Sequence, residues 1–117
     1  MKEDDLVGLR DALRKFAADR DWDQFHSPRN LAAALSVEAS EVLEHFQWMS
    51  EEQSLALAPG AREAVGLELA DVLNYLVRLA DKLDVDLIAT AHKKMQINAE
   101  KYPVELSRGS SRKYSDL

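Results

Sequence analysis

This chain is organised around two acidic motifs: Ser36-Val-Glu38-Ala-Ser-Glu41 and, after a gap, Glu68-Leu-Ala-Asp71. Each motif holds two acids spaced i, i+3 among apolar, helix-favouring residues. Three residues of helix rotate the chain by about 300° and advance it by about 4.5 Å, so each pair projects from one side of its helix. Two such helices side by side would bring the four carboxylates together.

A cluster of four carboxylates needs a cation. At roughly 4 Å, each like-charged pair would repel by about 4 kcal/mol at an effective dielectric near 20. Without a cation the cluster would spread apart or take up protons. Hard oxygen ligands are those that Mg²⁺ and Mn²⁺ require. The alternative for any single pair is a solvated helix face, but both pairs border apolar stripes, where unpaired charges are rare. The pattern favours a shared metal site.

The composition indicates one soluble globular domain. The chain has 117 residues, of which 46% are hydrophobic and 31% charged, enough for a modest core or for one enlarged by oligomerisation. A formal net charge of −6, without a basic run before a helix, argues against binding to a nucleic acid polymer. Cysteine is absent, which excludes disulfides and thiolate metal sites. The start, Met1-Lys-Glu-Asp-Asp5, lacks the apolar core of a signal peptide, and no apolar run could cross a membrane, so we expect a cytoplasmic protein.

The hydrophobic periodicity is helical throughout, and no strand pattern appears. We expect an all-α bundle of four main helices plus a short connecting helix, completed by oligomerisation. The expected N-caps are Asp4 or Asp5, Ser27, Ser50 (in a capping box with Gln53) and the Asp84–Asp86 segment. The expected ranges are residues 5–20, 28–48, 50–57, about 61–83, and 87–102, which ends before Pro103. Residues 1–103 form the predicted domain, and residues 104–117 a basic, flexible tail.

Apolar stripes predict the core. On the second helix the stripe comprises Leu31, Leu35, Ala39, Val42 and Phe46. On the long helix it comprises Val65, Leu69, Val72, Leu73, Leu76, Leu79 and Leu83.

An aromatic residue follows each acidic pair at a similar offset. Trp48 lies seven residues after Glu41, within about 20° of its direction on a helix, and Tyr75 lies seven after Glu68. Trp22 and His26 fall in the aromatic segment between the first two helices. These rings could simply form core, or they could line a nucleobase pocket, where stacking is worth about 1–3 kcal/mol per base.

Other chemical signals are weaker. His26 has no cysteine or second histidine at ligand spacing, so a hydrogen-bonding role is favoured over a zinc site. Lys94 and Asn98 are spaced i, i+4 on the last helix and face one way. No Walker loop, glycine-rich dinucleotide turn or Ser/His/Asp set is present.

With both acidic pairs on helices, the chain resembles the MazG-like all-α nucleoside triphosphate pyrophosphohydrolases, whose signature is E-x-x-E, a gap, then E-x-x-D. The resemblance is sharper to the dCTP pyrophosphatase branch and covers nearly the whole chain. The segments that carry it include Arg20-Asp-Trp-Asp-Gln-Phe-His26, Pro28-Arg-Asn-Leu31, Phe46-Gln-Trp48, Tyr75-Leu-Val77, Val85-Asp-Leu87, Tyr102-Pro103 and Ser110-Ser-Arg-Lys-Tyr114.

The resemblance implies a nucleotide site. Mg²⁺, with Mn²⁺ as a substitute, would be held by Glu38, Glu41, Glu68 and Asp71. Trp22, Trp48 and Tyr75 would surround the base and sugar, with His26 nearby, and Lys94 and Asn98 would contact the phosphate or sugar end. Family members are usually oligomers, which implies a homotetramer built as a dimer of dimers. Some relatives carry a histidine where this chain has Leu13, and this leaves the nucleotide preference open.

The predicted activity is Mg²⁺-dependent hydrolysis of a nucleoside triphosphate, dCTP or a modified dCTP, to the monophosphate and pyrophosphate, which cleanses the nucleotide pool. Glu38 or Glu41 would be the catalytic base that takes the proton of the attacking water. Two alternatives stay open at this point. One is the same chemistry on another nucleotide such as dUTP, and the other is a helical interaction module without catalysis.

Overall fold

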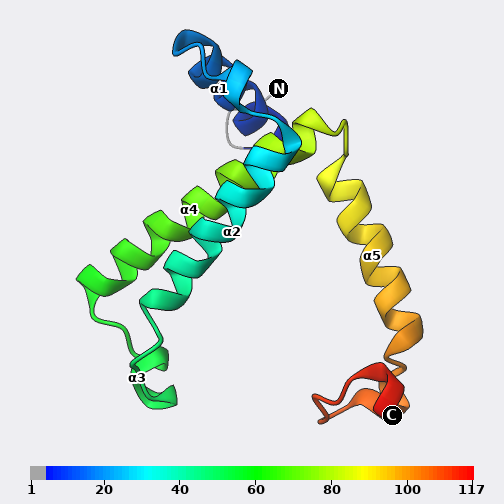
Figure 1. Ribbon diagram of the computed structural model, residues 1–117. Coiled ribbons are helices and arrows are strands. Elements are labelled where there is room, and N and C mark those ends of the chain that lie inside the picture. Colours follow the sequence, from blue (N-terminus) through cyan, green and yellow to red (C-terminus); the bar gives the residue numbers. More distant parts are fainter. Residues whose placement is uncertain (1–4) are drawn as a thin grey trace. The chain divides into compact units, whose positions relative to one another are not determined.

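The computed structural model describes residues 5–117 and shows helices and turns but no strand within that range. The all-α prediction is therefore confirmed. The helices are α1 (Leu6–Asp19), α2 (Pro28–Glu44), α3 (Glu51–Leu55), α4 (Pro59–Lys82), α5 (Leu87–Lys101) and α6 (Val104–Ser107), with short 3-10 turns at η1 (Asp23–Phe25) and η2 (Tyr114–Asp116) (Figure 1). None of the described helices combines the length and the apolar character needed to span a membrane.

Side-chain caps start four of the helices at the predicted residues. The Asp5 carboxylate accepts a hydrogen bond from the Gly8 N–H at 2.6 Å, and Asp4, the other candidate, lies outside the described residues. Ser27 and Asp86 cap α2 and α5 in the same way. Ser50 forms the predicted capping box with Gln53. Each cap satisfies N–H groups that have no partner within the helix.

Several predicted helix ends are wrong. α2 ends at Glu44, because the chain tightens into turns in which the Phe46 N–H bonds to the Leu43 carbonyl, so Trp48 does not lie on this helix. α3 ends at Leu55 instead of residue 57. α4 begins at Pro59 instead of residue 61, since proline fits the first helical position, where no N–H is needed.

The chain divides into two compact units, one up to Asp84 and one from Val85 onward. In the first unit, α2 and α4 run antiparallel side by side, and α1 packs against α4 (Figure 1). The buried apolar side chains of the described residues all belong to this unit: Ala17, Leu31, Val65, Val77 and Ala80.

The predicted apolar stripe of α4 is only partly buried. Val65 is buried, but Leu69, Leu73 and Leu76 expose 53%, 41% and 37% of their surface. The first unit by itself does not bury these three leucines, which were predicted to be core. The reason is that periodicity reports which face is apolar, whereas burial requires another element to cover that face.

The second unit contains α5, α6 and η2. The ring of Tyr102 packs edge-on against that of Tyr114 with centroids 6.0 Å apart, and Lys101 lies over the Tyr114 ring at 4.9 Å. The segment predicted as a flexible tail, residues 104–117, thus contains a short helix and a turn that sequence periodicity did not indicate. The division after residue 103 stays a prediction.

Candidate functional site

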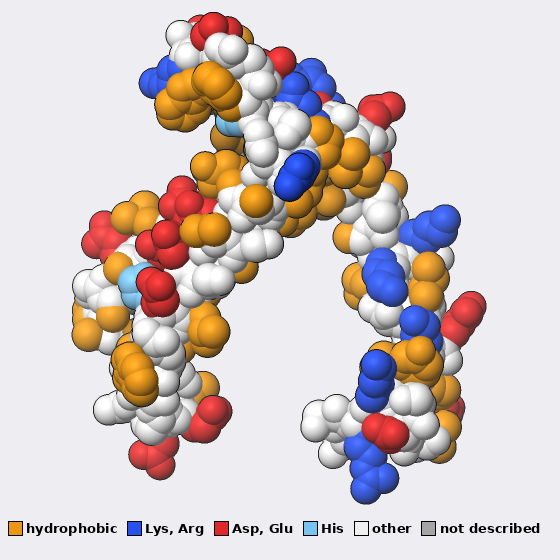
Figure 2. All heavy atoms as spheres, viewed as in Figure 1, with side chains coloured by type: hydrophobic (Ala, Val, Ile, Leu, Met, Phe, Trp, Pro, Cys, Tyr) orange, Lys and Arg blue, Asp and Glu red, His pale blue; other side chains and the backbone are white. Residues whose placement is uncertain are grey.

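Three glutamates from two helices form an acidic cluster. Glu38 and Glu41 lie on α2 and Glu68 lies on α4, and each offers a carboxylate oxygen within 4.8 Å of the others. Figure 2 shows acidic side chains gathered over these two helices. The i, i+3 spacing on α2 and the antiparallel packing of α4 together produce the convergence that the two motifs predicted.

Within the described part of the chain, two oxygen atoms of the cluster lack a hydrogen-bond donor. Oε2 of Glu38 and Oε2 of Glu68 are shielded from solvent and have no hydrogen-bond partner among residues 5–117. The neighbouring Glu41 carboxyl, which hydrogen-bonds to the protonated form, raises the pKa of Glu38 to about 7, and lost hydration and nearby acids add to the shift. The pKa of Glu68 is raised mainly by burial, and the hydrogen bond and negative charge of Glu41 raise it further. Oxygen atoms that repel one another and have no donors suit a divalent cation that prefers oxygen ligands.

Asp71 lies next to this cluster without joining its three-oxygen group. Its negative charge contributes to the raised pKa values of Glu38 and Glu68. It also lines a neighbouring cavity. Asp71, the fourth acid of the predicted set, therefore lines the cavity beside the three-glutamate cluster.

The cavity next to Asp71 has a volume of about 260 Å³ and is mostly apolar. Three of the residues predicted to bind substrate line this cavity: Trp22 and Tyr75, expected around the base, and His26, expected nearby. Leu13, Asn74 and Arg78 also contribute to its wall. The structure thus places an aromatic cavity beside the acidic cluster.

A tight turn after α1 positions the aromatic wall. Asp21 adopts a left-handed backbone conformation with φ of 56°, which aspartate tolerates better than most residues. The Trp22 N–H then bonds back to the Ala17 carbonyl at 2.9 Å. The Trp22 ring packs edge-on against Phe16 at 5.8 Å and lies 6.5 Å from the His26 ring.

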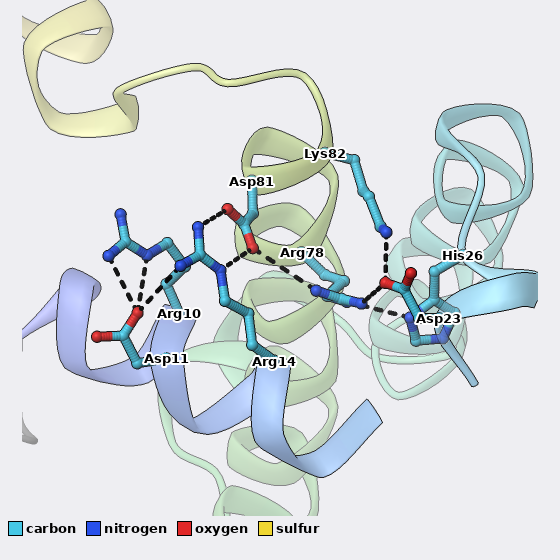
Figure 3. A network of polar contacts seen from close by, with 8 residues as sticks. All are labelled: Arg10, Asp11, Arg14, Asp23, His26, Arg78, Asp81 and Lys82. Carbon is cyan, nitrogen blue, oxygen red and sulfur yellow. Dashed lines mark hydrogen bonds and ion pairs between the residues drawn. The ribbon is translucent and has the colours of Figure 1, made fainter. Parts of the chain in front are cut away.

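Arg78 is a site residue that the sequence analysis missed. Its side chain is 6% exposed, and Nε donates to His26 Nδ1 at 3.1 Å while Nη2 donates to Asp23 at 2.6 Å. Figure 3 shows these contacts within a wider network that extends through Asp81 to Arg14. The available signal was a single arginine in the apolar run 76–80, three residues after Tyr75.

His45 is a second residue near the acids that the sequence analysis did not identify. Its Nε2 lies 3.9 Å from Oε1 of Glu68, and its charge opposes the raised pKa of that carboxyl. It precedes the aromatic pair Phe46 and Trp48, and no motif spacing connected it to the acids.

Three predicted site residues lie away from the cavity or on the second unit. Trp48 is 88% exposed and follows the end of α2, and it is not among the residues that line this cavity. Lys94 and Asn98 are exposed on α5. Figure 2 shows basic side chains along α5 and the segment after it. The roles assigned to these three residues stay predictions.

Comparison with known proteins identifies the family. The family model described as MazG-like matches residues 33–117. The chain belongs to the MazG-like family. Over 98% of its length it is 49% identical to dCTP pyrophosphatase 1 of Rattus norvegicus and 46% identical to the protein of that name in Homo sapiens, and each comparison covers 69% of the relative.

A solved structure agrees with this MazG-like assignment. The crystal structure of a pyrophosphatase from Archaeoglobus fulgidus matches with a TM-score of 0.79 and 38% identity, covering 84% of this chain and 92% of that one. The resemblance drawn from the two acidic motifs is thereby confirmed at the level of family and fold.

Proposed function

We propose that this MazG-like protein is a metal-dependent nucleoside triphosphate pyrophosphohydrolase that acts on dCTP or base-modified dCTP. The observation that carries the proposal is the convergence of Glu38, Glu41 and Glu68 beside an aromatic cavity. Relatives at 46–49% identity are named dCTP pyrophosphatase 1, which supports both the reaction and the base. The products are the nucleoside monophosphate and pyrophosphate, and the role is the cleansing of the nucleotide pool in the cytoplasm.

The acidic residues fit a divalent cation. Glu38, Glu41, Glu68 and Asp71 would hold it, since two of these carboxylates carry shielded oxygens without a donor. Mg²⁺, or Mn²⁺ in its place, would polarise the phosphates and a water molecule. The pKa of Glu38 is raised to about 7 by its hydrogen bond with Glu41, by lost hydration and by repulsion from the other acids, and a bound cation would relieve that repulsion.

The reaction requires a base for the attacking water. Glu38 or Glu41 takes one proton from this water, whose oxygen forms a bond to the α-phosphorus as the bond from that phosphorus to the α,β-bridging oxygen breaks. The electron pair of the broken bond leaves on pyrophosphate. The protein's part is therefore to position the water in line and to hold the proton.

The cavity provides the base site in this proposal. Trp22 and Tyr75 offer ring faces on which a pyrimidine stacks, and His26 offers a polar edge. As the family resemblance implies, Lys94 and Asn98 would contact the phosphate or sugar end, and Trp48 would help to surround the base and sugar. The exposed leucines of α4 pair with those of a second copy, in a homotetramer built from dimers.

The first test is a substrate panel. The protein is incubated with each dNTP and Mg²⁺, and released pyrophosphate is measured. We expect turnover of dCTP that stops when Mg²⁺ is chelated. If only dUTP or a purine triphosphate is hydrolysed, the proposed reaction stands but the proposed substrate, dCTP, is wrong. No pyrophosphate from any substrate, with a melting temperature indifferent to Mg²⁺, would favour a non-catalytic interaction module.

The second test is Glu41→Gln, with Glu44→Gln as its matched control. Both residues lie on α2 three positions apart, but only Glu41 belongs to the acidic cluster. We expect Glu41→Gln to keep the fold and to lose at least about 100-fold in kcat, the scale typical of an acid–base residue. Glu44→Gln should match the wild type. Equal activity of the two variants would refute the site assignment.

A further inference from the structure

Arg78 donates a hydrogen bond to Nδ1 of His26, and this contact fixes which ring nitrogen carries the proton. An arginine side chain stays protonated in proteins and has no acceptor, so the Nε–H of Arg78 donates and His26 Nδ1 must present its lone pair. A neutral histidine then carries its proton on Nε2. Because His26 lines the cavity, Nε2–H is the polar group that its ring can offer to a ligand there.

The guanidinium of Arg78 is held from three sides. Asp23 accepts from Nη2 at 2.6 Å, His26 accepts from Nε, and Asp81 lies 3.6 Å from Nη1. A planar fork with partners in three directions has little freedom to rotate. The arginine is also almost fully buried, so the direction of its Nε–H is set by the fold.

Burial and nearby positive charges favour the neutral form of the His26 ring. Burial, together with the positive charges of Arg78 and Lys82 on α4, lowers the pKa of His26, while Asp23 on its own turn opposes this shift. Asp71 lines the same cavity from α4. The ring is therefore a donor at Nε2 and an acceptor at Nδ1 at neutral pH, and its acceptor is already used by Arg78.

We propose that Arg78 is a positioning residue that holds His26 as a hydrogen-bond donor toward the cavity, where it pairs with an acceptor atom of the pyrimidine, a carbonyl oxygen or an unprotonated ring nitrogen. This inference rests on the proposed function for the identity of the ligand. A base that presents an N–H at the same place meets a second donor and is rejected, because two donors leave both polar groups unpaired.

The tautomer is tested first, on wild-type protein without substrate. Long-range ¹H–¹⁵N correlation spectra of protein labelled at histidine show which nitrogen carries the proton at neutral pH. We expect His26 to carry it on Nε2. A proton on Nδ1 would overturn the inference even if dCTP is hydrolysed, so its failure is separate from a failure of the proposed function.

Binding is tested with dCMP, first on single variants of Arg78 and Arg14. We expect Arg78→Met to raise the Kd for dCMP by about five- to tenfold, the scale of one hydrogen bond, and to raise KM for dCTP while kcat is kept. Asp23 and Asp81 keep Lys82 and Arg14 as partners in this variant. Arg14→Met removes a guanidinium from the same network without touching His26, and its Kd and histidine spectrum should match the wild type.

The double variant separates positioning from a structural role. If Arg78 acts through His26, the double variant with Arg78→Met and His26→Phe should bind dCMP with the same Kd, within about twofold, as the single variant His26→Phe. If Arg78→Met instead weakens dCMP binding by the full factor of about five to ten in the His26→Phe protein, Arg78 acts independently of His26 and the inference is overturned. A wild-type protein that binds no dCMP would also overturn it.

Discussion

The carboxyl group of Glu38 couples the stability of the metal-free protein to pH. Its pKa is raised from 4.5 to about 7 by Glu41, by lost hydration and by the neighbouring acids. A raised folded-state pKa contributes stability that is fully present below the unfolded pKa and is lost as pH rises through the folded value. Between these two values the folded protein binds more protons than the unfolded chain.

Glu38→Gln should remove this dependence, because an amide does not titrate. With chelator present, we expect wild type to lose stability relative to Glu38→Gln as pH rises from about 5 to about 8, measured by urea unfolding. Mg²⁺ added at the higher pH should raise the wild-type unfolding free energy more than that of the variant. Parallel pH profiles of the two proteins would contradict the assigned environment of Glu38.

At the scale of the element, the start of α2 determines where the aromatic wall sits. Ser27 Oγ accepts from the Asn30 N–H at 3.1 Å, and the Asn30 side chain donates to the Phe25 carbonyl at 3.0 Å. These two bonds connect the helix end to η1, which precedes His26. The helix cap thus supports the turn that lines the cavity.

Ser27→Ala should lower the free energy of unfolding by about 1 kcal/mol, because it removes the cap from an N–H that has no helical partner. Ser36→Ala is the matched control on the same helix. Ser36 Oγ donates to the Ala32 carbonyl in mid-helix, where alanine is the better helix former, so its stability should equal or slightly exceed that of wild type. If Ser27→Ala and Ser36→Ala lower the free energy of unfolding in urea by the same amount, the stabilising role of the Ser27 cap is contradicted.

At the scale of the whole molecule, the proposed oligomer would cover the exposed leucines of α4. Leu69, Leu73 and Leu76 each expose more than a third of their surface on one helix. Covering a leucine side chain is worth about 1.5–3 kcal/mol. A second copy of the chain would supply that cover, and the tetramer is the expected assembly.

Leu73→Glu should weaken this association, because it would bury a charge at the interface. We expect sedimentation equilibrium to give a mass well above the 13.2 kDa of one chain for wild type and a lower mass for the variant. Glu63→Gln, a change at an exposed position elsewhere around α4, should keep the wild-type mass. A monomeric wild type would contradict the predicted assembly.

Local interactions explain what could be predicted. The caps at Asp5, Ser27, Ser50 and Asp86 join residues three apart in sequence, and a helix fixes which way an i, i+3 acidic pair points. The end of α2 was missed because turns near Phe46 compete closely with another helical turn. Trp48 was therefore placed on a helix that stops before it.

The helical class, the four capped helix starts and the pairing of acids within each motif could be predicted from the sequence, because they depend on neighbours along one helix. The packing of the helices brings Glu38 and Glu41 to Glu68, brings Arg78 to His26 across 52 residues of sequence, and leaves leucines that were expected in the core exposed. Those outcomes depend on which helix faces pack together. Periodicity describes each face but does not name its partner.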